Sequence, residues 1–132
     1  MKRLFWIGVL VCFAVSPALA QDPVKVDPKH YKVVFENDQV RVLRIHYGPH
    51  EKSVMHEHPD GVATFLADQR AKFTMPDGKS VERAGKSGDA LWLAGEKHLP
   101  ENLSDKPLDA ILVELKGKAA AAAPAKAAPK KK

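Results

Sequence analysis

The chain has 132 residues, of which 45% are hydrophobic and 28% charged. This composition suits one globular domain and excludes a multidomain protein or a fully disordered one. The net charge of +5 would suit a nucleic-acid-binding protein, but the excess positive charge lies at the two ends of the chain. Residues 21–115 contain 13 Lys and Arg against 16 Asp and Glu. The part that can fold is therefore mildly acidic, and we expect no nucleic-acid partner.

Residues 1–20 have the three parts of a secretory signal peptide. Lys2 and Arg3 precede an apolar run over residues 4–15, and Ala18 and Ala20 supply the small residues of a cleavage site. The run of about 12 residues is shorter than the roughly 20 that a spanning helix needs, which favours cleavage after Ala20 over an uncleaved membrane anchor. The sequence thus predicts a periplasmic or secreted protein.

The only cysteine, Cys12, lies within this apolar run and should leave with the signal peptide. The mature chain then has neither a disulfide nor a cysteine ligand for zinc. After the signal peptide we expect an N-terminal extension at residues 21–29, a folded domain at 30–116 and a basic tail at 117–132. The tail is built almost entirely of Lys, Ala and Pro, a composition typical of disorder. Electrostatic attachment to the anionic cell envelope is an alternative role for it.

The folded segment consists of short apolar runs separated by turn residues. No stretch keeps a period of 3.6 residues over three turns, so we expect no long helix. Without helices to cover a sheet, the strands must close on themselves. The prediction is an all-β barrel or sandwich of about seven or eight antiparallel strands, with Phe65, Phe73, Trp92 and Leu112 in its core. The predicted strands cover residues 31–36, 40–47, 62–67, 71–75, 80–83, 90–93 and 110–115.

Three of the six histidines have an informative spacing. His56 and His58 form an H-x-H pair, and alternate residues of a strand share a face. The turn Pro59-Asp60-Gly61 places this pair at a strand end, and His98 follows the predicted strand at residues 90–93. Three neutral imidazoles suit Zn²⁺, Fe²⁺, Mn²⁺, Ni²⁺ or Cu²⁺. An isolated H-x-H also occurs on exposed strands, and the spacing alone does not bring His98 to the pair. The other histidines are predicted to be exposed: His30, His46 and His50.

These residues resemble the two-part signature of the cupins, small jelly-roll β-barrels. Gly48 followed by His56-Glu57-His58 is similar to the first part, and Gly88 through Gly95-x-x-His98-x-x-x-Asn102 is similar to the second. The resemblance covers about 85 residues. It implies that His56, His58 and His98 converge at the barrel mouth and bind a divalent transition metal.

The chain departs from that signature at the glutamate that usually completes the metal site. This residue should fall at position 62 or 63, which are Val62 and Ala63. The departure leaves either a three-histidine site, as in some cupin-like thiol dioxygenases, or a barrel that has lost its metal and binds a small ligand. No other base or nucleophile in the sequence indicates a particular reaction, so the sequence does not decide between an enzyme and a binding module. If it is an enzyme, dioxygenase-like or isomerase-like chemistry on a small molecule is implied. Homodimer formation is also left open.

Overall fold

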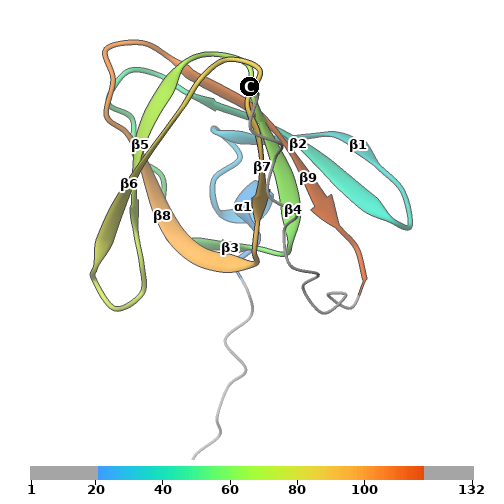
Figure 1. Cartoon of the computed structure of the whole chain (residues 1–132). Coiled ribbons are helices and arrows are strands. Elements are labelled where there is room, and N and C mark those ends of the chain that lie inside the picture. Colours follow the sequence, from blue (N-terminus) through green and yellow to red (C-terminus); the bar gives the residue numbers. More distant parts are fainter. Residues whose placement is uncertain (1–20, 118–132) are drawn as a thin grey trace, which may run out of the picture.

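The computed structural model describes residues 21–117 (Figure 1). The expected signal peptide and almost all of the expected tail lie outside this range. No helix between residues 21 and 117 has the length and apolar character needed to span a bilayer. The elements in chain order are α1 (Pro23–Val26), β1 (Tyr31–Glu36), β2 (Val40–Tyr47), β3 (His56–His58), β4 (Gly61–Phe65), β5 (Gln69–Thr74), β6 (Ser80–Gly85), β7 (Ala90–Leu93), β8 (Glu96–Asn102) and β9 (Leu108–Leu115).

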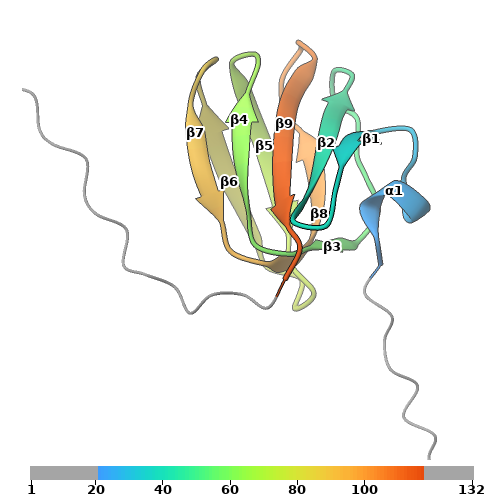
Figure 2. The same cartoon turned by 90° about the vertical axis from the view of Figure 1, so that its right-hand side faces the viewer.

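The strands form two antiparallel sheets that face each other, as Figures 1 and 2 show. One sheet has the order β1-β2-β9-β4-β7, and the other has the order β3-β8-β5-β6. The all-β prediction is confirmed, with nine strands among the described residues where about seven or eight were expected. One strand that was not expected is β8: the segment around His98, expected to follow a strand, is itself a strand that pairs with β3.

The core lies between the two sheets and is built by residues that alternate along each strand. On β9 the inward positions are Leu108, Ala110, Leu112 and Glu114, all buried. Leu43 of β2 is the cross-strand partner of Leu112, and both side chains are almost completely buried. Each large apolar side chain buried in this way contributes about 1.5–3 kcal/mol to stability. The single acid in this inward series, Glu114, belongs to the site described below.

The expected core is confirmed for Phe65 and Leu112, and Phe73 packs against it while staying partly exposed. The prediction for Trp92 was wrong, because its side chain is 54% exposed. Trp92 is the register partner of Val62 on the outer face of the five-stranded sheet, whereas its neighbours Leu91 and Leu93 point inward and pack on the core. The strand itself was predicted correctly, but the face of the sheet on which Trp92 lies was not.

A single helical turn, α1, ties the N-terminal segment to the barrel. The Asp22 carboxylate accepts a hydrogen bond from the Val24 amide at 3.0 Å, and Pro23 opens the helix where its missing N–H costs nothing. The Asp27 amide donates to the Pro23 carbonyl and ends the turn. Just before α1, the Gln21 carbonyl accepts a hydrogen bond from the Glu57 amide of β3 at 3.0 Å. The segment expected as an extension therefore packs beside the H-x-H strand (Figure 2).

The close approach of β4 and β9 depends on Gly61. A Cβ atom at this position would lie 2.4 Å from the carbonyl oxygen of Val113, which is backbone and cannot rotate away. We expect Gly61→Ala to lower the free energy of unfolding by about 1–3 kcal/mol, as overpacked positions do. Urea denaturation measures the loss, with Gly48→Ala as the matched control. A Cβ at Gly48 meets only the flexible end of Glu51, so equal losses in the two variants would contradict this account.

Candidate metal centre

The pairing of β3 with β8 brings the three predicted histidines together. His56 is the direct cross-strand partner of His98, and His58 shares the face of His56 two residues along. All three side chains are buried, and their ring centroids lie 4.8–5.4 Å apart. One nitrogen of each ring lies within 4.8 Å of a nitrogen of the other two. The convergence that the spacing alone did not show is thus a result of the sheet register.

Each of these rings is held at its Nδ1 atom by an oxygen that accepts a hydrogen bond. His56 Nδ1 lies 2.8 Å from the Val54 carbonyl, His58 Nδ1 lies 2.6 Å from Glu114 Oε1, and His98 Nδ1 lies 2.8 Å from Glu96 Oε1. A carbonyl or an ionised carboxylate can only accept, so Nδ1 carries the proton in all three rings. Each neutral ring therefore keeps a lone pair at Nε2. This is the arrangement that orients histidine ligands in metal sites.

The Nε2 atom of His56 is left without a partner. Among the residues that the structure describes, it is the single buried side-chain nitrogen or oxygen that makes no hydrogen bond. A buried polar atom without a partner costs free energy, and a cation bound at the lone pair would remove that cost. The donor set, three neutral imidazoles with outer partners, fits a divalent transition metal.

Burial keeps two of the three imidazoles neutral far into the acid range. Burial, together with the charges that His58 and His98 carry when protonated, lowers the pKa of His56 to about 3. Burial also lowers the pKa of His98 to about 4, although its hydrogen bond to Glu96 opposes the shift. Both rings are therefore uncharged, the form that can bind a metal, at neutral pH and well below it.

The acids behind the histidines are ionised and paired with arginines. Burial would raise the pKa of Glu114, but hydrogen bonds from His58 and Arg41 outweigh it, so the pKa lies below its usual value. The same balance, with Arg83 and His98 as donors, lowers the pKa of Glu96. Arg41 Nε lies 2.6 Å from Glu114 Oε2, and both terminal nitrogens of Arg83 donate to Glu96. These pairs fix the orientation of the carboxylates that hold His58 and His98.

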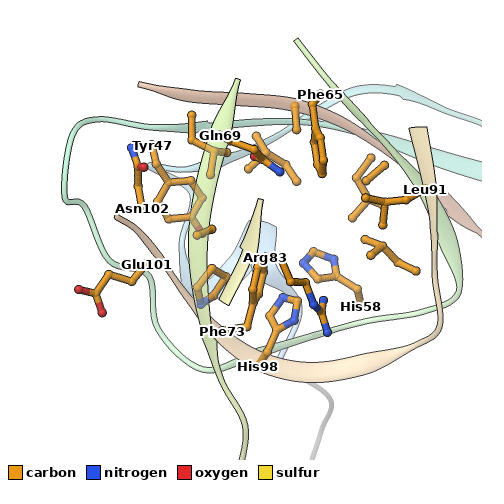
Figure 3. A pocket seen from close by; sticks show the side chains of 18 of the residues that line it. Tyr47, His58, Phe65, Gln69, Phe73, Arg83, Leu91, His98, Glu101 and Asn102 are labelled. Atoms are coloured by element: carbon orange, nitrogen blue, oxygen red, sulfur yellow. The ribbon is translucent and has the colours of Figure 1, made fainter. Parts of the chain in front are cut away.

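A mostly apolar cavity of about 90 Å³ opens beside the cluster, inside the barrel. Figure 3 shows His58 and His98 at one end with Phe73 and Arg83 next to them, and Phe65 and Gln69 towards the other end. The guanidinium of Arg83 lies over the Phe73 ring, 4.7 Å from its centroid. A cavity of about 150 Å³ lined by apolar side chains holds benzene in another protein, so the smaller space here suits only a small ligand.

The departure from the cupin signature has a structural counterpart. Val62 points to the outer face of its sheet, whereas Ala63 points inward and lines the cavity. The inward position therefore contributes a methyl group to the cavity in place of a carboxylate. Glu57, between the two histidines, is exposed on the opposite face, as its place in the alternation predicts.

The other histidines divide into two kinds. His46 and His50 are exposed, as expected, and pair with Asp109 and Asp105. The prediction of a surface position for His30 was wrong, because its side chain is only 5% exposed. It lies between Asp27 and Glu51, with its ring stacked on Tyr47 at 4.2 Å. Only the folding of the N-terminal segment against the barrel buries this ring.

Sequence analysis missed the acids that orient the histidines, although two of them left a signal. Glu96 precedes His98 by two residues, so the two share a face of β8. Glu114 occupies an inward position of an otherwise apolar strand, where an unpaired acid would be costly. The contributions of Arg41, Asp22 and Asp27 left no such signal, because they come from segments far from the histidines in the sequence.

Comparisons with known proteins give structural likeness alone. No protein-family profile matches the sequence, and no curated protein matches it either. Among solved structures, a cupin domain from Bordetella pertussis Tohama I superposes with a TM-score of 0.61 and 24% identity, over 66% of this chain and 92% of that chain. A double-stranded β-helix domain protein from Klebsiella pneumoniae gives 0.54 and 23%, over 70% and 82%.

A third similar structure is an RmlC-like cupin family protein from Methanocaldococcus jannaschii, with a TM-score of 0.52 and 14% identity over 64% of this chain and 77% of that chain. All three are described as cupin or double-stranded β-helix proteins. At these identities the likeness concerns the fold and transfers no site residue. The chain is a small protein with the cupin fold.

Proposed function

We propose that the protein binds one divalent transition metal through Nε2 of His56, His58 and His98, and presents it to a small molecule in the barrel cavity. The observation that supports this most strongly is the partnerless buried Nε2 of His56. The other two rings are oriented in the same way, with their Nδ1 atoms held from behind. Three protein ligands leave coordination positions for water or a substrate.

A metal at this site would supply Lewis-acid or redox chemistry to a ligand in the cavity. The chain itself supplies the rest. Glu114 and Glu96 fix the tautomer of two ligand rings, and the apolar walls exclude water from the cavity. Arg83 closes the site beside His98 (Figure 3). Its charge is already paired with Glu96, so the wall adds little net charge of its own.

The cavity favours a compact ligand with little polar surface. Its walls are formed largely by side chains that cannot hydrogen-bond, such as Phe65, Phe73, Leu91 and Leu93. A sugar would lose hydrogen bonds to water at each hydroxyl group without regaining them here, which costs free energy for every group. We therefore propose a small aromatic or aliphatic molecule as the ligand.

We further propose that this site operates outside the cytoplasm, as the signal peptide over residues 1–20 predicts. The mature chain has no cysteine, and histidine ligands do not depend on the redox state of the compartment. Attachment through the tail at residues 117–132 and homodimer formation are separate predictions that the metal site does not require.

A ligand-binding barrel without metal is the second candidate function. The observation in its favour is the methyl group of Ala63 at the position where the signature implies a metal-binding carboxylate. In that case the three imidazoles would form one polar end of an otherwise apolar pocket. The experiments below separate the two candidates.

Metal binding is tested on the mature protein purified without a histidine tag. We expect close to one equivalent of metal by elemental analysis or after reconstitution with Zn²⁺. We also expect His56→Ala to weaken Zn²⁺ affinity at least about 100-fold in a chelator competition, because it removes one of three ligands. The control is His46→Ala, which removes an exposed histidine. Equal affinities in the two variants, or a wild-type protein that takes up no metal, would exclude the site.

The lowered pKa values predict how the stability of the metal-free protein depends on pH. The unfolded chain takes up protons on these histidines near pH 6.5, whereas the folded chain holds His56 and His98 neutral down to about pH 3 and 4. Between pH 6.5 and about pH 3 to 4, the unfolded state therefore binds more protons than the folded state. The free energy of unfolding is highest above pH 6.5 and falls as the pH drops through this range.

Each of the two histidines should lower the free energy of unfolding by roughly 1.4 kcal/mol per pH unit below 6.5. Urea denaturation of metal-free protein between pH 7 and 4.5 measures this slope. Carboxyl groups with ordinary pKa values titrate mostly below that window, so the double variant His56→Gln, His98→Gln should flatten the slope. A wild-type stability that stays constant from pH 7 to 4.5 would contradict the buried neutral state.

The second candidate function predicts ligand binding that does not need the metal. If that function is correct, phenol should cause saturable NMR shifts of Phe65 and Phe73 in metal-free protein and in the His56→Ala, His98→Ala double variant. Glycerol, which has more hydroxyl groups, serves as the control probe. Ala71→Leu, which fills the cavity wall, should abolish the phenol shifts. Shifts that appear only after Zn²⁺ is added would favour the metal-dependent function instead.

A further inference from the structure

We infer that the N-terminal segment Gln21–Asp27 supports the metal centre. The two aspartates at the ends of α1, Asp22 and Asp27, are positioning residues that orient the rings of the H-x-H pair. Each aspartate begins a chain of contacts that ends at one of the two histidines. The consequence for metal affinity rests on the proposed function. The positioning of the rings does not, because it is a property of the metal-free fold.

The first chain runs from Asp22 to His58. One oxygen of the Asp22 carboxylate caps α1, and the other accepts a hydrogen bond from an Arg41 terminal nitrogen at 2.8 Å. Arg41 Nε donates to Glu114 Oε2 at 2.6 Å, and Glu114 Oε1 accepts from His58 Nδ1 at 2.6 Å. Arg41 is thus held between two carboxylates. Loss of Asp22 would free the guanidinium to turn and to carry Glu114 away from its position behind His58.

The second chain runs from Asp27 towards His56. Asp27 Oδ2 accepts hydrogen bonds from Ser53 Oγ and from His30 Nδ1, the latter at 2.6 Å. Ser53 Oγ lies 3.4 Å from His56 Nδ1, and the next residue, Val54, provides the carbonyl that accepts from the same nitrogen at 2.8 Å. Asp27 therefore fixes the short segment that orients His56, and it does so from within the buried region.

The backbone and the aromatic rings strengthen the connection. The Gln21 carbonyl pairs with the Glu57 amide, which lies between the two histidines. Tyr31 begins β1 directly after this segment, with its amide bonded to the Asp27 carbonyl. Its ring packs edge-on against His56, with centroids 4.8 Å apart, and its hydroxyl lies 2.6 Å from that of Tyr47. The segment from residue 21 to 31 thus contacts the H-x-H strand through its backbone and the His56 ring through Tyr31.

His98 provides an internal comparison, because its support comes from the barrel alone. Glu96 and Arg83, which hold its Nδ1, belong to β8 and β6. No described contact of Asp22 or Asp27 reaches either residue. A change at the ends of α1 should therefore alter two of the three ligand rings and leave the third as it is, a pattern that general loss of stability would not produce.

The chains also place negative charge behind the site. Asp22, Arg41 and Glu114 together carry one net negative charge, and Asp27 is a further buried acid near His56. A divalent cation among neutral imidazoles would otherwise have no counter-charge, since Ala63 occupies the position expected for a carboxylate ligand. The acids of the N-terminal segment thus act on the cation from a distance through a medium of low polarity.

Two substitutions cut the chains while sparing the helix caps. Asparagine is as good an N-cap as aspartate, so Asp22→Asn keeps α1 but removes the charge that holds Arg41. Asp27→Asn replaces the charged acceptor of Ser53 and His30 by a neutral amide oxygen, while its backbone still closes the helical turn. The control is Asp38→Asn, which removes an exposed acid from the turn between β1 and β2. All three variants change the net charge equally.

The experiment uses the mature protein labelled with ¹⁵N at histidine. In the metal-free state, NMR reports which ring nitrogen carries the proton. We expect Asp22→Asn to change the His58 signals, Asp27→Asn to change those of His56, and neither to change those of His98. Zn²⁺ affinity by chelator competition should weaken about 10-fold or more in both variants, as losses of outer-shell partners do, and should stay within twofold of wild type in Asp38→Asn.

The outcomes separate this inference from the proposed function. If the ring signals and the Zn²⁺ affinity of both variants match those of Asp38→Asn, the inference is overturned. If wild-type protein binds no Zn²⁺, the proposed function fails, and the ring signals of the metal-free protein still decide the positioning. If Asp27→Asn does not fold, Ser53→Ala replaces it, because it cuts the link to His56 and leaves the contact of Asp27 with His30 intact.

Discussion

Three imidazoles share a buried space in which each Nδ1 is fixed by an acceptor and the Nε2 of His56 has no partner. The rest of the structure depends on this constraint. A buried lone pair needs a donor or a cation. Burial, and the mutual repulsion of rings that carry a proton, keep the pKa values of His56 and His98 low. The proposed divalent metal would satisfy the lone pairs without protonating the rings, because the fold already holds His56 and His98 in the uncharged form.

The groups that hold the three histidine rings come from different parts of the chain. The barrel itself supplies Glu96 and Arg83 behind His98, whereas the segment before β1 completes the support of His56 and His58 through Asp27 and Asp22. Because Ala63 stands where the cupin signature has a carboxylate, these acids would supply negative charge and rigidity behind the proposed ligands. The N-terminal segment then belongs to the site as well as to the fold.

The cavity and the cluster together limit the chemistry. The site offers three ligands, one paired arginine and mostly apolar walls around about 90 Å³. Among the described residues that line the cavity, the one acid is Glu101, which pairs with Lys72, and the acids behind the rings, Glu96 and Glu114, are both held by arginines. Selectivity would therefore come from size and polarity, and reactivity from the bound metal.

The sequence by itself determined the all-β architecture, most of the strand positions and the identity of the three histidines, because alternation and H-x-H spacing are local patterns. It misplaced Trp92 and His30, since the phase of an edge strand and the burial of a terminal segment depend on what packs against them. Only the tertiary structure decided that His98 lies opposite His56 and that Arg41 connects Asp22 to Glu114. These contacts join residues far apart in the chain, and sheet register, which no local pattern encodes, sets their distances.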